Sequence, residues 1–305
     1  MDLNYFKKTR ILDGGMGQEL LAKGLVSKGT LWSTSALLDD KFHQLLIDVH
    51  TSFINAGADV IVTNNFSSRK VRLIQNKVED KFEYVNKKAC ELANKAREIS
   101  KENILVAGSL PPQNGTYVID ERNINTIKKD FKEQAEIIKP YVDFFYLDVI
   151  TSAKEVEAAC EVTEKMNMPV LVGLHLKKNG KIASGETITE IVEKYKTNNW
   201  IGLIGACVSL EIIEKSSNEM ANLNIPFGFK ANLWKVEEPL PVNKFNTAKF
   251  NEVGKNPNDT LGKGDEITNE IFYNFAKSIK EKGANILGGC CNINPDHIKL
   301  LSSLK

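Results

Sequence analysis

Short apolar segments alternate with longer amphipathic segments along the whole chain, and this alternation most limits the folds available to it. The apolar segments are typical of buried β-strands, because they are short and are bounded by turn residues. Strands and helices in regular alternation predict a parallel sheet covered by helices. Eight strands are expected, at residues 10–14, 59–65, 104–110, 143–149, 169–176, 200–208, 226–233 and 285–291.

The segments between these strands have the apolar period of amphipathic helices. Several begin at Asp, Ser or Thr with an acidic residue soon after, and two end at glycine, as helix caps commonly do. Helices are expected at residues 39–57, 78–100, 126–140, 152–167, 187–199, 209–224, 268–283 and 295–305.

Eight strand–helix units predict an α/β fold, a single-domain (β/α)8 TIM barrel over residues 1–305. An open, doubly wound sheet is the alternative. The barrel is preferred because no GxGxxG turn follows the first strand and no change in composition divides the chain. Residues 236–267 interrupt the alternation with many Pro, Gly and Asn residues, so a long loop is expected after strand seven, either a functional lid or a disordered insert.

Composition and charge limit the partners. The 305 residues include 40 basic and 39 acidic ones, a net charge of +1 that gives no basis for nucleic-acid binding. The first residues form no long apolar segment and no run of about 18 apolar residues occurs, so neither a signal peptide nor a membrane partner is expected. These features predict a cytoplasmic protein that acts on small molecules, and they do not define an oligomeric state.

Three of the five cysteines follow predicted strands: Cys207 after the sixth, and Cys290 and Cys291 after the eighth. In a barrel the carboxyl ends of the strands meet at one mouth, so these thiols are expected to gather there. The remaining two, Cys90 and Cys160, fall in amphipathic helices and are expected in the core.

Two interpretations of the three thiols remain open. They are either small side chains packed beside glycines, or a sulfur-rich tetrahedral zinc site with one position left for another ligand. Three thiolates outweigh the charge of Zn2+, which makes such a site poor at generating hydroxide but suited to holding a fourth, external thiolate. The residues therefore favour thiol alkylation over hydrolysis.

Five motifs along the chain, in this order, resemble the homocysteine S-methyltransferase family: ILDGGMGQEL, INAGADVIVTNNF, FFYLDVITS, IGLIGACVS and LGGCCNINPDHI. The resemblance extends from about residue 9 to the C-terminus, and the paired cysteines with the downstream PDHI are its most specific part. That family consists of zinc-dependent (β/α)8 barrels. The resemblance therefore implies a methyltransferase that makes methionine from homocysteine with Zn2+ as cofactor.

The resemblance also implies roles for single residues. Cys207, Cys290 and Cys291 match the zinc ligands, with the homocysteine sulfur as the fourth ligand. Asp13 matches an acid near the substrate amino group and the methyl-transfer site, and Gly14 offers its backbone to the substrate.

Two positions depart from the family pattern. Asp148 stands where a glutamate usually holds the homocysteine ammonium, and Ala206 stands where asparagine usually precedes the cysteine. Both changes affect amino-acid recognition, so a different thiol acceptor remains an alternative. A non-catalytic zinc- or thiol-binding protein is a further alternative, which the acids at the strand ends and the long loop disfavour.

The methyl donor is expected to be a small onium compound: S-methylmethionine, glycine betaine or dimethylsulfoniopropionate, with S-adenosylmethionine also open. Trp32 matches a tryptophan that faces the onium donor in betaine-using relatives, a cation–π contact worth about 1 to 2 kcal/mol; an ordinary anchor for the following helix is the alternative. Where betaine users have tyrosines, this chain has Ser67 and Val149. Further substrate contacts are expected from three residues at strand ends: Asn64, His175 and Asn232. For His175, a structural role is the alternative.

Overall fold

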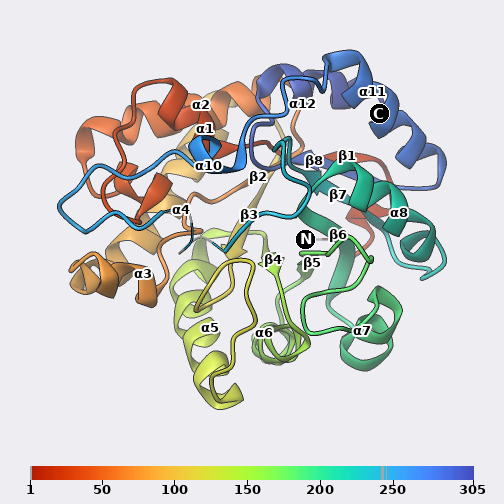
Figure 1. Ribbon diagram of the computed structural model, residues 1–305, viewed down its shortest axis with the longest axis horizontal. Coiled ribbons are helices and arrows are strands. Elements are labelled where there is room, and N and C mark those ends of the chain that lie inside the picture. Colours follow the sequence, from red (N-terminus) through yellow and green to blue (C-terminus); the bar gives the residue numbers. More distant parts are fainter. Residues whose placement is uncertain (1, 242–243, 245) are drawn as a thin grey trace.

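Eight parallel strands form the centre of the protein in the computed structural model, which describes residues 2–241, 244 and 246–305 (Figure 1). They pair in the order β1-β8-β7-β6-β5-β4-β3-β2. The strands are β1 (Arg10–Ile11), β2 (Val60–Val62), β3 (Leu105–Leu110), β4 (Phe144–Ile150), β5 (Val170–Leu174), β6 (Trp200–Val208), β7 (Phe227–Ala231) and β8 (Ile286–Gly289).

Backbone hydrogen bonds between β1 and β2 close the sheet. Leu12 forms a parallel bridge to Val60, the N–H of Asp13 donates to Val60 O at 3.0 Å, and the N–H of Asp59 donates to Ile11 O at 2.7 Å. The predicted (β/α)8 barrel is therefore confirmed, and the open sheet is excluded. Both strands are shorter than expected, because the glycines after Asp13 and the turn at Asn64 take the chain out of the ladder.

Eight helices surround the barrel in a closed ring (Figure 1). Each packs against the next along the chain, and the last returns to the first. Capping boxes begin three of them, at Ser152, Thr187 and Asn294, as the polar residues before these segments predicted. The ring consists of α2 (His43–Asn55), α4 (Phe82–Ser100), α5 (Ile124–Ile138), α6 (Ala153–Lys165), α7 (Ile188–Tyr195), α8 (Leu210–Ala221), α11 (Asn269–Glu281) and α12 (Pro295–Ser302).

In the described part of the chain, three short α-helices lie outside this ring: α1 (Met16–Ala22), α3 (Lys70–Gln75) and α10 (Asn258–Leu261). The sequence did not predict them, because segments of four to seven residues contain too few turns to show an apolar period. All three belong to connections that follow strands at the carboxyl end of the barrel. They therefore shape the mouth rather than the outer wall.

The barrel interior is packed with side chains from its amino end upward. Phe6, in a 3-10 helix at Tyr5–Lys7, is fully buried and packs edge-on against Phe144 with ring centroids 5.9 Å apart. The same apolar cluster continues to Cys207 at the opposite end. Cys90 and Cys160 are buried among helix and sheet residues, which confirms their expected place in the core.

The predicted loop at 236–267 includes residues 242, 243 and 245, which lie outside the described residues. Its described part contains α10 and extends past the side of the barrel where α1 and α3 lie (Figure 1). It pairs there with residues 27–29, since the N–H of Gly29 donates to Glu252 O at 2.8 Å and that of Gly254 to Ser27 O at 2.9 Å. Within the described ranges, no helix has both the length and the apolar character needed to cross a bilayer.

Candidate active site

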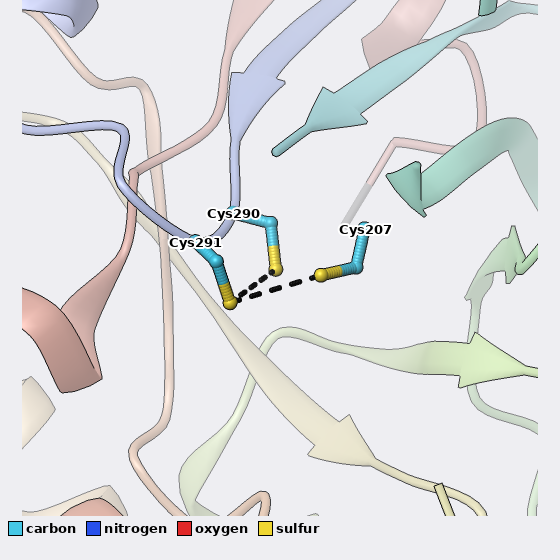
Figure 2. Close-up of side chains that lie close together, drawn as sticks. All are labelled: Cys207, Cys290 and Cys291. Atoms are coloured by element: carbon cyan, nitrogen blue, oxygen red, sulfur yellow. Dashed lines mark hydrogen bonds between the residues drawn. The ribbon is translucent and has the colours of Figure 1, made fainter. Parts of the chain in front are cut away.

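Three cysteine thiols converge at the carboxyl end of the barrel (Figure 2). Cys207 lies near the end of β6, and Cys290 and Cys291 directly follow β8, with β7 between the two strands. The Cys291 Sγ lies 3.8 Å from the Cys207 Sγ and 3.9 Å from the Cys290 Sγ. Figure 2 shows the three sulfurs turned toward a common point.

These separations fit a metal site. Tetrahedral coordination with metal–sulfur bonds of about 2.3 Å places neighbouring ligand sulfurs about 3.8 Å apart. Thiolate ligands select soft or borderline metals such as zinc and copper(I). All three thiols line one cavity, so a further ligand has access to them. Metal binding therefore explains the cluster better than simple packing does.

The backbone around Cys207 has an unusual conformation and is held by contacts from Asn232 and His175. Its φ of 53° is left-handed, a conformation that costs about 1 kcal/mol or more for a residue with a side chain. Asn232 Nδ2 donates to the Cys207 carbonyl at 2.7 Å, and His175 Nδ1 lies 3.3 Å from the carbonyl oxygen of Ala206. Burial lowers the pKa of His175 to about 4, so the ring is neutral. Neither Asn232 nor His175 lines the cavity, so both position Cys207.

Tyr117, in the connection after β3, is a further contact of the metal site. Its Oη lies 3.2 Å from Cys207 Sγ, and its ring packs 4.5 Å from the His175 ring, centroid to centroid. Burial, and then the neighbouring thiols, raise the pKa of Tyr117 well above its usual value. The phenol therefore keeps its proton and donates to an ionised Cys207. Sequence analysis missed it because it lies beyond the strand end, where no periodic signal marks it.

A buried ion pair joins Asp13 and Lys230. Lys230 Nζ lies 2.5 Å from Asp13 Oδ1 and 3.2 Å from the Asp13 carbonyl oxygen, while the N–H of Val62 donates to Asp13 Oδ2 at 2.7 Å. Burial alone would lower the pKa of Lys230, but the Asp13 carboxylate outweighs it and the pKa is raised. Burial also raises the pKa of the Asp13 carboxyl group, although Lys230 opposes that shift. The close contact makes the two side chains one paired group in the cavity lining.

Asp148, in β4, faces the same cavity and has a different environment. The hydroxyl of Ser109 donates to its Oδ2 at 2.9 Å. Burial raises the pKa of Asp148 to about 7, although Lys230 and the Ser109 hydrogen bond oppose the shift. This carboxyl group therefore changes charge near neutral pH.

The opposite wall carries Trp32 and Asn64. The Trp32 indole lies directly on Gly17 of α1, where an added Cβ would come within 2.1 Å of its Nε1, so only glycine fits there. Asn64 Nδ2 donates to the carbonyl of Ser33 at 3.0 Å and holds this segment in place. The structure thus gathers eight of the ten predicted site residues around one cavity: Asp13, Gly14, Trp32, Asn64, Asp148, Cys207, Cys290 and Cys291.

Two arginines that sequence analysis did not select also line the cavity, Arg69 and Arg72. Both are buried, with exposed fractions of 1% and 6%. In the sequence they belong to a short, charged segment of the kind that normally faces solvent. Only the folded chain shows their burial.

A closed (β/α)8 barrel with three thiols gathered between β6 and β8 defines a barrel protein with a thiolate metal centre. The family model for homocysteine S-methyltransferase matches residues 10–304, nearly the whole chain. The chain belongs to the homocysteine S-methyltransferase family and is a methyltransferase.

Known proteins that are similar to this chain in sequence or in fold include enzymes from plants, animals and bacteria. Homocysteine S-methyltransferase 1 of Arabidopsis thaliana is 25% identical, with 96% of this chain and 92% of the plant protein covered. The S-methylmethionine–homocysteine S-methyltransferase BHMT2 of Pongo abelii is 28% identical, with 95% and 76% covered. The metallated homocysteine methyltransferase MmuM of Escherichia coli has the same fold, with a TM-score of 0.78 at 19% identity over 98% of this chain and 96% of that one.

Removing any one of the three thiols should weaken metal binding. Replacing Cys207, Cys290 or Cys291 by serine is expected to lower metal affinity by about 100-fold or more, because a ligand of the cluster is lost. Metal content after dialysis against a competing chelator, measured by plasma mass spectrometry, checks this. Cys160→Ala, in the buried core of α6, is the matched control and should retain the metal. Equal metal content in all four variants would contradict the assignment.

Proposed function

We propose that the protein is a zinc-dependent homocysteine S-methyltransferase that transfers a methyl group from a small onium donor to homocysteine and forms methionine. The observation that carries this proposal is the cluster of three thiols open to a cavity that Asp148 also lines. Membership of the family supports homocysteine as acceptor. The reduced thiols that the site needs also support a cytoplasmic location.

Residues of the chain would hold the zinc ion and orient its thiolate ligands. A zinc ion bound by these thiolates would hold the homocysteine sulfur as a nucleophilic thiolate near neutral pH. Asn232 fixes the backbone at Cys207, and the phenol of Tyr117 donates to its sulfur. Hydrogen bonds of this kind orient a metal ligand and tune its charge.

Two carboxyl groups are placed to receive the amino acid. Asp148, ionised above its pKa of about 7, would attract the homocysteine ammonium. A carboxylate has about four acceptor sites, and Asp13 uses only part of them for Lys230 and the N–H of Val62, so it retains capacity for a substrate N–H. The backbone of Gly14 lines the cavity beside Asp13.

The transfer itself needs positioning more than acid–base catalysis. The homocysteine sulfur would form a bond to the donor methyl carbon while the bond from that carbon to the onium sulfur or nitrogen breaks. The electron pair stays on the former onium sulfur or nitrogen, which becomes uncharged and needs no proton to leave. Trp32 would face the onium cation, and the aromatic neighbours supplied by betaine users are replaced here by Ser67 and Val149. S-Methylmethionine, glycine betaine and dimethylsulfoniopropionate are the candidate donors.

A different thiol acceptor is the second candidate. The ammonium of Lys230 already pairs with Asp13, the acid that the family places near the substrate amino group. Ala206 lacks the side chain that hydrogen-bonds at this position in relatives. Both observations favour an acceptor whose amino group is bound less closely than that of homocysteine, or one that has none.

Zinc-loaded protein should form methionine from homocysteine and at least one of the three onium donors. Mass spectrometry of the product, with each donor in turn and with a panel of other thiols, checks this. Cys291→Ala without metal is expected to lose about 1000-fold or more of the rate, since the sulfur then lacks its activating site. Methylation of another thiol alone would favour the second candidate. No methylated thiol with any donor would support a non-catalytic zinc-binding protein instead.

The charge of Asp148 should make homocysteine binding pH-dependent. Because its pKa is about 7, the carboxyl group is ionised at pH 8 and largely neutral at pH 6, so the KM for homocysteine should rise by up to about tenfold on acidification. Asp148→Asn should have a high KM that changes little over this range. Ser109→Ala removes a hydrogen bond that lowers the pKa and should move the profile to higher pH. An unchanged KM in Asp148→Asn would exclude this role.

A further inference from the structure

Two guanidinium groups, those of Arg69 and Arg72, lie in the cavity of the three thiols without an acidic partner. No aspartate or glutamate in residues 2–241, 244 and 246–305 forms an ion pair with either. The two arginines stand at the beginning of α3, Arg69 as the residue before it and Arg72 in its first turn. Burying a charge without a counter-charge costs several kcal/mol, so such a pair needs an explanation.

Within the described residues, each hydrogen bond of Arg69 goes to a neutral group. Its Nη1 donates to the carbonyl of Pro112 and its Nη2 to Thr116 Oγ1 at 2.6 Å, while its Nε has no partner among the described residues. The guanidinium also lies over the ring of Phe66, 5.3 Å from its centroid. Burial lowers the pKa of Arg69 to about 9. A negative group beside it would reverse that shift.

Arg72 has still fewer partners. Within the described parts of the chain its side chain makes one hydrogen bond, from Nη1 to Gln75 Oε1 at 3.2 Å. Burial lowers the pKa of Arg72, and no acid opposes the shift. The remaining N–H groups of its fork are therefore available to a ligand in the cavity.

The acids that influence the pKa of Arg69 do not form an ion pair with Arg69 or Arg72 in the described residues. Burial and then the neighbouring Arg72 lower the pKa of Arg69, and they outweigh Glu155 and Asp148, which raise it. Glu155 Oε2 is engaged by the hydroxyl of Ser152 at 2.8 Å, within the cap of α6. Asp148 Oδ2 accepts a hydrogen bond from the hydroxyl of Ser109 at 2.9 Å. Among the described residues, Arg69 and Arg72 therefore form a positively charged part of the cavity lining that is not paired with a carboxylate.

We propose that Arg69 and Arg72 bind the carboxylate of a substrate and are specificity-determining residues of this cavity. Planar guanidinium forks match the two oxygens of a carboxylate, and charge-assisted bonds of this kind are among the strongest available. The carboxylate belongs either to a zwitterionic onium donor or to homocysteine itself. This inference rests on the proposed function and names the substrate class of the same site.

A chain of contacts connects this site to the thiols. Arg69 holds the hydroxyl of Thr116, the next residue is Tyr117, and its Oη contacts Cys207 Sγ. The arginines and the three cysteines also line the same cavity. A small molecule can span them, with its carboxylate on the arginines and its reacting atom near the sulfurs.

Steady-state kinetics of zinc-loaded protein tests the site with matched substrates. Dimethylsulfoniopropionate is compared with trimethylsulfonium, which lacks the carboxylate, and homocysteine with 3-mercaptopropylamine, which lacks it in the same way. Arg72→Gln should raise the KM for the carboxylated member of one pair by about tenfold or more and leave its carboxylate-free analogue within about twofold. The pair that responds identifies the substrate that carries the carboxylate.

Two further variants separate charge from structure. Arg72→Lys keeps the positive charge and should recover part of the lost affinity. Lys70→Gln removes a charge from the same helix outside the cavity, where Lys70 pairs with Glu133, and should change neither KM. Unchanged KM values in Arg72→Gln for both pairs would overturn the proposal.

Titration calorimetry distinguishes failure of this site from failure of the proposed function. Binding of dimethylsulfoniopropionate and of homocysteine is measured directly, whether or not methionine is formed. Binding to the parent protein that weakens in Arg72→Gln supports the carboxylate site even in the absence of turnover. Equal affinity of the two proteins, or no binding of either compound, overturns it.

Discussion

The hydrogen bonds between β1 and β2 close the sheet, and every feature of the site depends on that closure. The strand order places β6 and β8 on either side of β7, and closing the sheet into a barrel turns the residues at their carboxyl ends toward one mouth. Cys207 and the Cys290–Cys291 pair, far apart in the sequence, then come within 4.8 Å. The side chain of Asp59 strengthens the closing point, since it accepts the N–H of Ile11 at 2.8 Å.

The cavity above the closed barrel is chemically divided. One part holds the soft thiols, supported by the neutral groups of Tyr117 and Asn232. The ion pair of Asp13 with Lys230 lies beside them and is internally compensated. The two buried arginines also line this cavity, and no carboxylate of the described residues forms an ion pair with them. This separation suits a reaction in which a sulfur nucleophile meets a cationic methyl group while a remote carboxylate fixes the substrate.

The fold and the metal site could be predicted from the sequence because both depend on local patterns. Alternating strands and helices determine the barrel, and a cysteine at a strand end lies at the mouth whatever the loops do. Tyr117, Arg69 and Arg72 could not be predicted in this way. Their role depends on burial, which comes from contacts with Pro112, Thr116 and other residues distant in sequence. Charged residues in a short helix look solvent-exposed until the rest of the chain covers them.

The central claim is that the three thiols hold zinc and leave one position for the homocysteine sulfur. Zinc K-edge X-ray absorption of the loaded protein, recorded with and without homocysteine, tests it most directly. We expect three sulfur neighbours at about 2.3 Å and one lighter atom, with a fourth sulfur replacing that atom when homocysteine is added. Fewer than three sulfur neighbours, or a spectrum unchanged by homocysteine, would contradict it.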